Sequence, residues 1–275
     1  MKNYKFLFLI LFVSTVSLAQ KSVLIRFKPK PGSTLTANMG MNMDMKMKVG
    51  EQDILTKMEM GFVMLYNNLD RKKDVNEIEM SFDRVTMKMT NLVMNGTYDS
   101  DIKGATDPFA KKIAEGFTGV IKNPVSMKIN TIGEFAEPLD ISKLFAKIPA
   151  AKAKELEEQM SNQFIQFPKE KVKVGGTWAM ESTMNQVGVV KFTYTLVAIE
   201  KKTLLLTVKG DLLSSSNENL KLLSSGIEGT VVLDKKTGET LKSDMTMDMQ
   251  MQITAQGKTM ETNMIAKINL SATHM

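Results

Sequence analysis

The stretch MGMNMDMKM, residues 39–47, places methionine at every odd position and glycine, asparagine, aspartate or lysine at every even one. Side chains alternate between the two faces of a β-strand, so a strand here carries its thioethers on one face and its polar groups on the other. The same alternation returns at residues 245–251 as MTMDMQM. Together the two methionine ladders predict an antiparallel sheet with one apolar face and one wet face.

Further strand-like runs follow one another along most of the chain. Turn signals separate them at 49–51, Asn95-Gly96, 200–202, 234–238 and 256–257. The pattern predicts a long antiparallel meander. Its remaining strands are expected at 53–66, 77–98, 124–132, 177–185, 189–199, 203–213, 227–234 and 259–271.

A helical insert is expected in the middle of this meander, at about 107–165. Asp107 can cap a helix that has Pro108 at its first position, and apolar residues then recur at helical spacing through Val120. A second stretch follows at 140–147 and again at 149–164. We therefore expect an α+β fold in which a large curved antiparallel sheet, half-barrel or barrel-like, packs against the insert.

A faint internal repeat accompanies the ladders. Thr34-Leu35 precedes the first ladder and Thr240-Leu241 the second, at the same offset of 206 positions that separates Met39 from Met245. One interpretation is two related sheet halves that flank the helical insert. The other is that alternating methionine strands resemble each other whatever their origin.

Residues 1–19 are expected to be a secretory signal peptide. Lys2 and Lys5 precede an apolar run from Phe6 to Val13, and small residues lead to a cleavage site after Ala19. No cysteine follows that run, so no lipid anchor is expected, and no second apolar run is long enough for a transmembrane segment. The mature chain, 20–275, is thus predicted to be one α+β domain in the periplasm, the outer envelope or the extracellular space.

Composition argues against several functional classes. The 275 residues include 24 methionines, no cysteine and one histidine. The chain therefore lacks the cysteine and histidine residues that a thiol nucleophile, imidazole-based catalysis or a zinc site would need. The basic residues are scattered, which does not favour nucleic-acid binding. Three short pieces match an acyl-enzyme signature, but their turn contexts make coincidence the better interpretation: Ser100-Asp101-Ile102-Lys103, Ser215-Ser216-Asn217 and Lys236-Thr237-Gly238. We expect a protein that is not an enzyme and uses no cofactor.

Phe167-Pro168 and the Val-Gly-x-x-Trp piece at 174–178 carry a family resemblance, supported by shorter pieces such as Lys30 to Thr34. In these residues the chain resembles an uncharacterised family of secreted proteins from Gram-negative bacteria, known only as a domain of unknown function. Its layout is similar to the lipoprotein-carrier type of fold, a curved sheet around helices with a hydrophobic interior. No activity and no functional residues follow from either likeness. Trp178, the single tryptophan, is expected to anchor the start of a strand.

The ladders are the candidate site, and three interpretations stay open. Methionine is flexible and polarizable, which suits the lining of a site for a hydrophobic or lipid-like ligand. The same face can instead be solid core, in a protein that docks to an envelope protein partner. Thioethers also select Cu(I), although His274, expected to fray at the terminus, offers no imidazole. The ligand-lining candidates are Met41, Met43, Met45, Met247, Met249 and Met251, and the copper alternative uses Met43, Met45, Met247 and Met249.

Overall fold

The computed structural model describes residues 21–92, 94–102, 104, 107–139, 164–184, 188–214, 220–255 and 258–275. Strands dominate these residues, and one helix accompanies them. The helix is α1 (Pro108–Gly116). The strands are β1 (Ser22–Val23), β2 (Thr34–Val49), β3 (Gln52–Lys72), β4 (Val75–Thr90), β5 (Asn95–Asp99), β6 (Val125–Asn130), β7 (Val172–Lys173), β8 (Thr177–Met184), β9 (Gly188–Ile199), β10 (Thr203–Ser214), β11 (Leu220–Asp234), β12 (Thr240–Ala255) and β13 (Lys258–His274).

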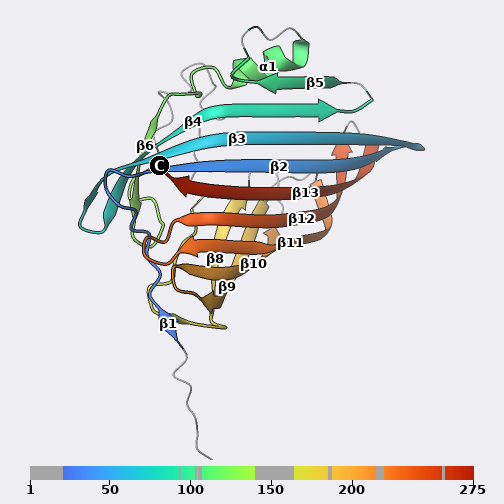
Figure 1. The fold of residues 1–275 in the computed structure, drawn as a ribbon. Coiled ribbons are helices and arrows are strands. Elements are labelled where there is room, and N and C mark those ends of the chain that lie inside the picture. The colour runs from blue at the N-terminus through green and yellow to red at the C-terminus, as the bar shows by residue number, and fades with distance from the viewer. Residues whose placement is uncertain are drawn as a thin grey trace, which may run out of the picture.

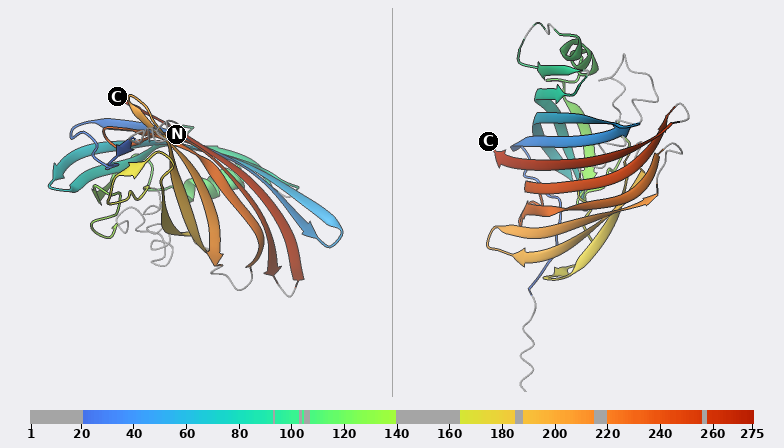
Figure 2. Two further views of the ribbon diagram at one scale, coloured as in Figure 1. Left: turned by 90° about the horizontal axis from the view of Figure 1, so that it is seen from below. Right: turned by 90° about the vertical axis from the view of Figure 1, so that its right-hand side faces the viewer.

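One antiparallel sheet of 11 strands organises the molecule. Its order is β5-β4-β3-β2-β13-β12-β11-β10-β9-β8, with β6 paired to β4, while β1 and β7 form a separate small sheet. Figure 1 shows β4, β3, β2, β13 and β12 side by side across the middle, and Figure 2 shows the sheet bent into an arch. The predicted large curved antiparallel sheet is confirmed. Its strand path is open, running from β5 at one end to β8 at the other.

The two faces of the sheet differ as the alternation predicts. We call the face that carries the odd-numbered residues of β2 the inner face, and the opposite one the outer face. The ladder methionines of β2 are half-buried on the inner face, whereas Asn42, Asp44 and Lys46 between them are exposed. Because directly paired residues of antiparallel strands share a face, the strand register extends both faces across the whole sheet.

The apolar core covers the inner face where β2 begins and β13 ends, which we call the core end. Leu196, Leu204, Leu206 and Leu233 from β9 to β11 are fully buried there, against Ile129 of β6. The chain segment around Phe27 packs on the same cluster and is held by a hydrogen bond from Phe27 N to Thr131 O at 2.8 Å. At its opposite end, the hairpin end, β2 passes into β3.

Two tyrosines of the core end provide a test of this packing. Burial raises the pKa of Tyr66 and of Tyr194 to about 12. Tyrosine in an unfolded chain ionises near pH 10, so between about pH 10 and 12 the unfolded state loses protons that the folded state keeps. Stability is therefore expected to fall as pH rises through that range. Tyrosinate absorbance followed against pH, with circular dichroism alongside, checks this; ionisation of all tyrosines near pH 10 in the folded protein would contradict it.

The helical insert is only partly as predicted. Asp107 caps α1 by accepting a hydrogen bond from Ala110 N at 2.8 Å, and Pro108 is the first helical residue, both as expected. The expected strand at 124–132 is β6, which pairs with β4 and belongs to the main sheet. The second helical stretch, 140–164, lies outside the described residues except for its last position. Within the described residues, no helix is long and apolar enough to cross a membrane.

Asn95-Gly96 does not form the predicted turn. The strand predicted at 77–98 is divided into β4 and β5, and both residues pair with β4 inside β5. The chain reverses just before them, where Asn91 N donates to Met94 O at 3.0 Å. Gly96 is needed for a close approach instead, because a Cβ there would lie 2.6 Å from the Phe109 ring of α1.

The two ladder hairpins match in the length of their first strand and in the spacing of their strands, although β3 has 21 residues and β13 has 17. β2 and β12 are 16 residues long and start 206 positions apart (240 − 34), and β3 and β13 also start 206 positions apart (258 − 52). The hairpins are neighbours in the order β3-β2-β13-β12, so a shift by two strands places one on the other. This agreement fits a duplicated hairpin, and the alternative of similar but unrelated strands stays open.

Candidate functional site

The strand register brings the two methionine ladders onto one continuous surface. Met43 of β2 lies opposite Met58 of β3 and opposite Ala266 of β13, and Ala266 lies opposite Met247 of β12. Directly opposite side chains have their Cβ atoms about 4.5–5.5 Å apart. The two ladders are thus separated only by β13, and together they form the centre of the inner face.

Other strands extend this surface with methionines that the sequence analysis did not single out. Met58 lies opposite Met89, and Met60 lies opposite both Met41 and Met87. On the other side of β2, Met264 of β13 lies opposite Met45 and Met249. We call the following set the methionine face: Met41, Met43, Met45, Met47, Met58, Met60, Met87, Met89, Met245, Met247, Met249, Met251 and Met264. The spacing by two at 58/60 and 87/89 was the signal available for them in the sequence.

Burial varies along the methionine face. On β2 the first inner residues, Leu35 and Ala37, are buried in the core end, and every ladder methionine beyond them is half-buried. On β12 the gradient is reversed: Met247 is half-buried, while Met249 and Met251 are 2% and 8% exposed. The six candidate ligand-lining residues therefore share one face, but they do not share one degree of exposure.

The four residues of the copper alternative do not adjoin one another. Met43 and Met45 are on β2 and Met247 and Met249 are on β12, two strand spacings away, or about 9.5 Å. Thioethers on neighbouring strands adjoin in other combinations, namely in the rows Met45–Met264–Met249, Met43–Met58–Met89 and Met41–Met60–Met87. Among the described residues there is also no group of three or more His, Cys, Asp or Glu placed to hold a metal ion.

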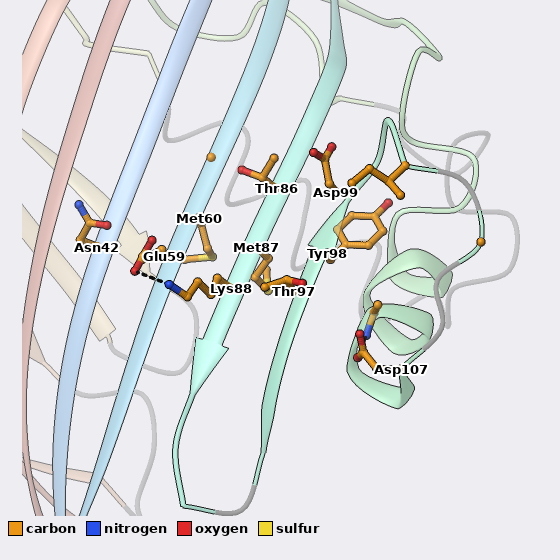
Figure 3. A pocket seen from close by; sticks show the side chains of 14 residues that line it. Asn42, Glu59, Met60, Thr86, Met87, Lys88, Thr97, Tyr98, Asp99 and Asp107 are labelled. Carbon is orange, nitrogen blue, oxygen red and sulfur yellow. Dashed lines mark hydrogen bonds and ion pairs between the residues drawn. The ribbon is translucent and has the colours of Figure 1, made fainter.

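Two grooves with mixed polar and apolar linings include charged residues of the outer face. One groove of about 600 Å³ crosses β3, β4 and β5 (Figure 3), where Lys88 Nζ lies 3.5 Å from Glu59 Oε1. At its rim the Arg84 guanidinium donates hydrogen bonds to Asp99, which lowers the pKa of that carboxyl. A second groove, of about 630 Å³, crosses β10 to β13 and is lined by charged and hydroxyl side chains such as Lys209, Glu228 and Thr230. Met60, Met87 and Tyr98 also line the first groove, and Met245 and Ile268 also line the second, so both linings are mixed.

His274 is not frayed, contrary to the prediction. It pairs with Leu35 as the last residue of β13, and its Nε2 lies 3.3 Å from Oε2 of the buried Glu239. Asn68 Nδ2 donates to the other oxygen of that carboxyl at 3.4 Å. The sequence could not reveal this contact because it depends on the register of β13 against β2. The pair ties the chain's last strand to the start of β12.

Two smaller sequence predictions are confirmed at the core end. Trp178 lies at the start of β8, donates from Nε1 to Gln166 O at 2.9 Å and stacks on Tyr194 at 5.5 Å. The segment 235–238 is a turn between β11 and β12, with Gly238 at φ +71°. Of the other acyl-enzyme pieces, Ser100 lies in a turn after β5, while Lys103 and 215–217 lie outside the described residues.

Comparison with models of protein families identifies a family that matches this chain. The model of a family of unknown function, DUF6263, matches residues 73–166 and 150–273, which together span most of the chain. The expected resemblance to a domain of unknown function is thereby confirmed, whereas the lipoprotein-carrier layout stays a prediction. No curated protein matches the chain.

Lipovitellin has a solved structure whose fold is similar to that of this chain. A structure of lipovitellin, determined for its lipid–protein interactions, matches at a TM-score of 0.53 and 11% identity, over 89% of this chain and 25% of the lipovitellin chain. The chain thus spans a quarter of that protein. An outer membrane channel of Pseudomonas putida F1 matches at 0.27 and 6% identity over 90% and 98%, and OpdQ of Pseudomonas aeruginosa at 0.23 and 7% over 88% and 99%.

Proposed function

The chain belongs to DUF6263, a family of unknown function, and from its inner face we propose that it binds a hydrophobic, lipid-like ligand without catalysing a reaction. The site is the methionine face, with Met41, Met43, Met45 and Met247 as its half-buried centre. We further propose that it does so as an exported protein of the cell envelope, as the leader-like residues 1–19 suggest.

The observation that carries the proposal is the gradient of burial along β2. Leu35 and Ala37 are buried by the core, but from Met39 to Met47 the same face of the same strand is half-buried. An apolar surface of this extent, left partly accessible in a folded protein, is typical of a ligand-binding or interaction site. The outer face is mostly polar and charged, although single apolar side chains such as Leu55 and Ile265 are exposed there.

Methionine is the residue expected for a ligand that varies in shape. Its unbranched side chain has three rotatable bonds and a polarizable sulfur, so neighbouring methionines can repack around different apolar chains. Leucine or valine on this face would give a more rigid lining. The similarity in fold to lipovitellin, whose structure concerns lipid–protein interactions, adds support to a lipid-like class of ligand.

Replacement of a cross-strand methionine pair by glutamine tests the proposal. We expect Met43→Gln with Met58→Gln to lower the affinity for dansyl undecanoic acid by about 30- to 150-fold, because each replacement removes roughly 1–1.5 kcal/mol of apolar contact. The two residues lie opposite each other on the inner face of β2 and β3. Titration of the probe's fluorescence with delipidated protein measures the effect.

The matched control is the neighbouring cross-strand pair, one position away from Met43 and Met58 on each strand. Asp44 and Lys57 are also a directly opposed pair on β2 and β3, but on the exposed outer face. Asp44→Gln with Lys57→Gln should leave the affinity within about twofold. Equal affinities for the inner-face and outer-face double variants would refute a site on the methionine face.

A further inference from the structure

We propose that the methionine face is also a modification site for hydrogen peroxide, and that oxidation of its half-buried thioethers releases the apolar ligand. The release step rests on the proposed function, whereas the modification itself does not. The chain contains 24 methionines and no cysteine, so thioethers are its sole sulfur groups.

Accessibility divides the described methionines into three groups. Met94 and Met275 are exposed, at 42% and 78%. Most of the methionine face is half-buried, including Met43, Met58 and Met264. The protected group has exposed fractions of 8% or less and consists of Met64, Met80, Met127, Met180, Met249 and Met251. We therefore expect an oxidant from solution to react fastest with the two exposed methionines, more slowly with the half-buried ones, and slowest with the protected group.

The reaction is a two-electron oxygen transfer. A thioether sulfur attacks one oxygen of hydrogen peroxide, an S–O bond forms, the O–O bond breaks, and the second oxygen leaves as water after proton transfer. Sulfur is oxidised to the sulfoxide and the peroxide is reduced, so no further reactant is needed. The product is polar and chiral, and methionine sulfoxide reductases return it to the thioether.

The strand register determines what a sulfoxide meets on this face. Met43 has Met58 and Ala266 as its two directly opposed neighbours, and Met264 has Met45 and Met249. None of these four side chains donates a hydrogen bond. The hydroxyls on the same face belong to Thr56, opposite Met45, and to Thr262, opposite Met47 and Met251. A sulfoxide oxygen at Met43 or Met264 has no donor directly opposite and must therefore draw water onto the methionine face, which opposes contact with an apolar ligand.

Peroxide treatment, followed by peptide mapping and probe titration, tests both steps. With limiting peroxide, later removed by catalase, we expect sulfoxides first at Met94 and Met275, next at Met43, Met58 and Met264, and least at Met64 and Met80. The affinity for dansyl undecanoic acid should fall at least tenfold as the second group reacts, and methionine sulfoxide reductases should restore it.

A variant resistant to oxidation separates release from general damage. Leucine replaces methionine at small cost in packing and does not react with peroxide. For a variant that combines Met43→Leu, Met45→Leu, Met58→Leu and Met264→Leu, peroxide should lower the probe affinity less than it does for the wild type, each protein being compared with its own untreated sample. Equal oxidation of Met64 and Met43 would overturn the modification site, and unchanged affinity of the oxidised wild type would overturn release. If the untreated protein does not bind the probe, the proposed function and release both fail, while the sulfoxide map still decides the modification site.

Discussion

Gly238→Ala is expected to lower the free energy of unfolding by about 2–5 kcal/mol. Gly238 has φ +71°, a conformation that costs a residue with a Cβ about 1–2 kcal/mol. A Cβ there would also collide with the backbone carbonyl of Arg26 and lie 3.2 Å from Phe27 N. Relief of that collision must separate the β11–β12 turn from the segment that Lys28 N anchors to Thr237 O at 2.7 Å, and such overpacking costs a further 1–3 kcal/mol or more.

Gly32→Ala is the control that isolates the backbone contribution. Gly32 has φ +77°, but nothing lies within 4 Å of a Cβ built on it. Its alanine variant should lose only about 1–2 kcal/mol. Urea unfolding of both variants, followed by the fluorescence of the single tryptophan, measures the difference; equal losses would show that the contact between the turn and Arg26 is not formed.

Asn76→Ala is expected to cost about 2–6 kcal/mol. Asn76 is 1% exposed, and its Nδ2 donates to Phe27 O at 2.9 Å and to Ile129 O at 3.1 Å. The side chain thus joins β4, β6 and the segment before β2. Each buried acceptor deprived of its donor costs about 1–3 kcal/mol, because the replacement provides no other partner.

Two further variants separate hydrogen bonding from volume. Asn76→Asp keeps the shape but removes the donor, so it should destabilise at least as strongly as alanine. Asn38→Ala, on the exposed outer face of β2, should stay within about 0.5 kcal/mol of the wild type. Thermal or urea unfolding provides the measurement. A tolerated Asn76→Asp variant would show that the two carbonyls do not depend on this amide.

The sequence was most informative where the period of two was longest. The ladders at 39–47 and 245–251 located β2 and β12 and assigned their inner residues correctly, because alternation is a local property of an extended chain. Gly96 was misassigned because a glycine inside a strand and a glycine in a turn look alike without the partner. Phe109, the ring that requires its missing Cβ, follows in α1 and is brought there only by tertiary packing.

Pairing between distant strands was the part that no local pattern could supply. Met43 and Met247 each appeared as candidates, but that Ala266 lies between them follows from the register of β13 against both β2 and β12. The same register brings His274 to Glu239. Contacts of this kind are set by the sum of many cross-strand pairs, and a single ladder does not encode them.

The position of β13 beside β2 has a consequence for the rate of folding. Their contacts join residues 213 to 239 positions apart in sequence (261 − 48 and 274 − 35). Contacts of such high order require the closure of nearly the whole chain, which places folding at the slow end for β-proteins. Until β13 arrives, the block β5-β4-β3-β2 presents an unpaired edge along β2 at the future centre of the sheet. That edge can pair with another nascent chain, so the newly made protein passes through a period of aggregation risk that ends with its last strand.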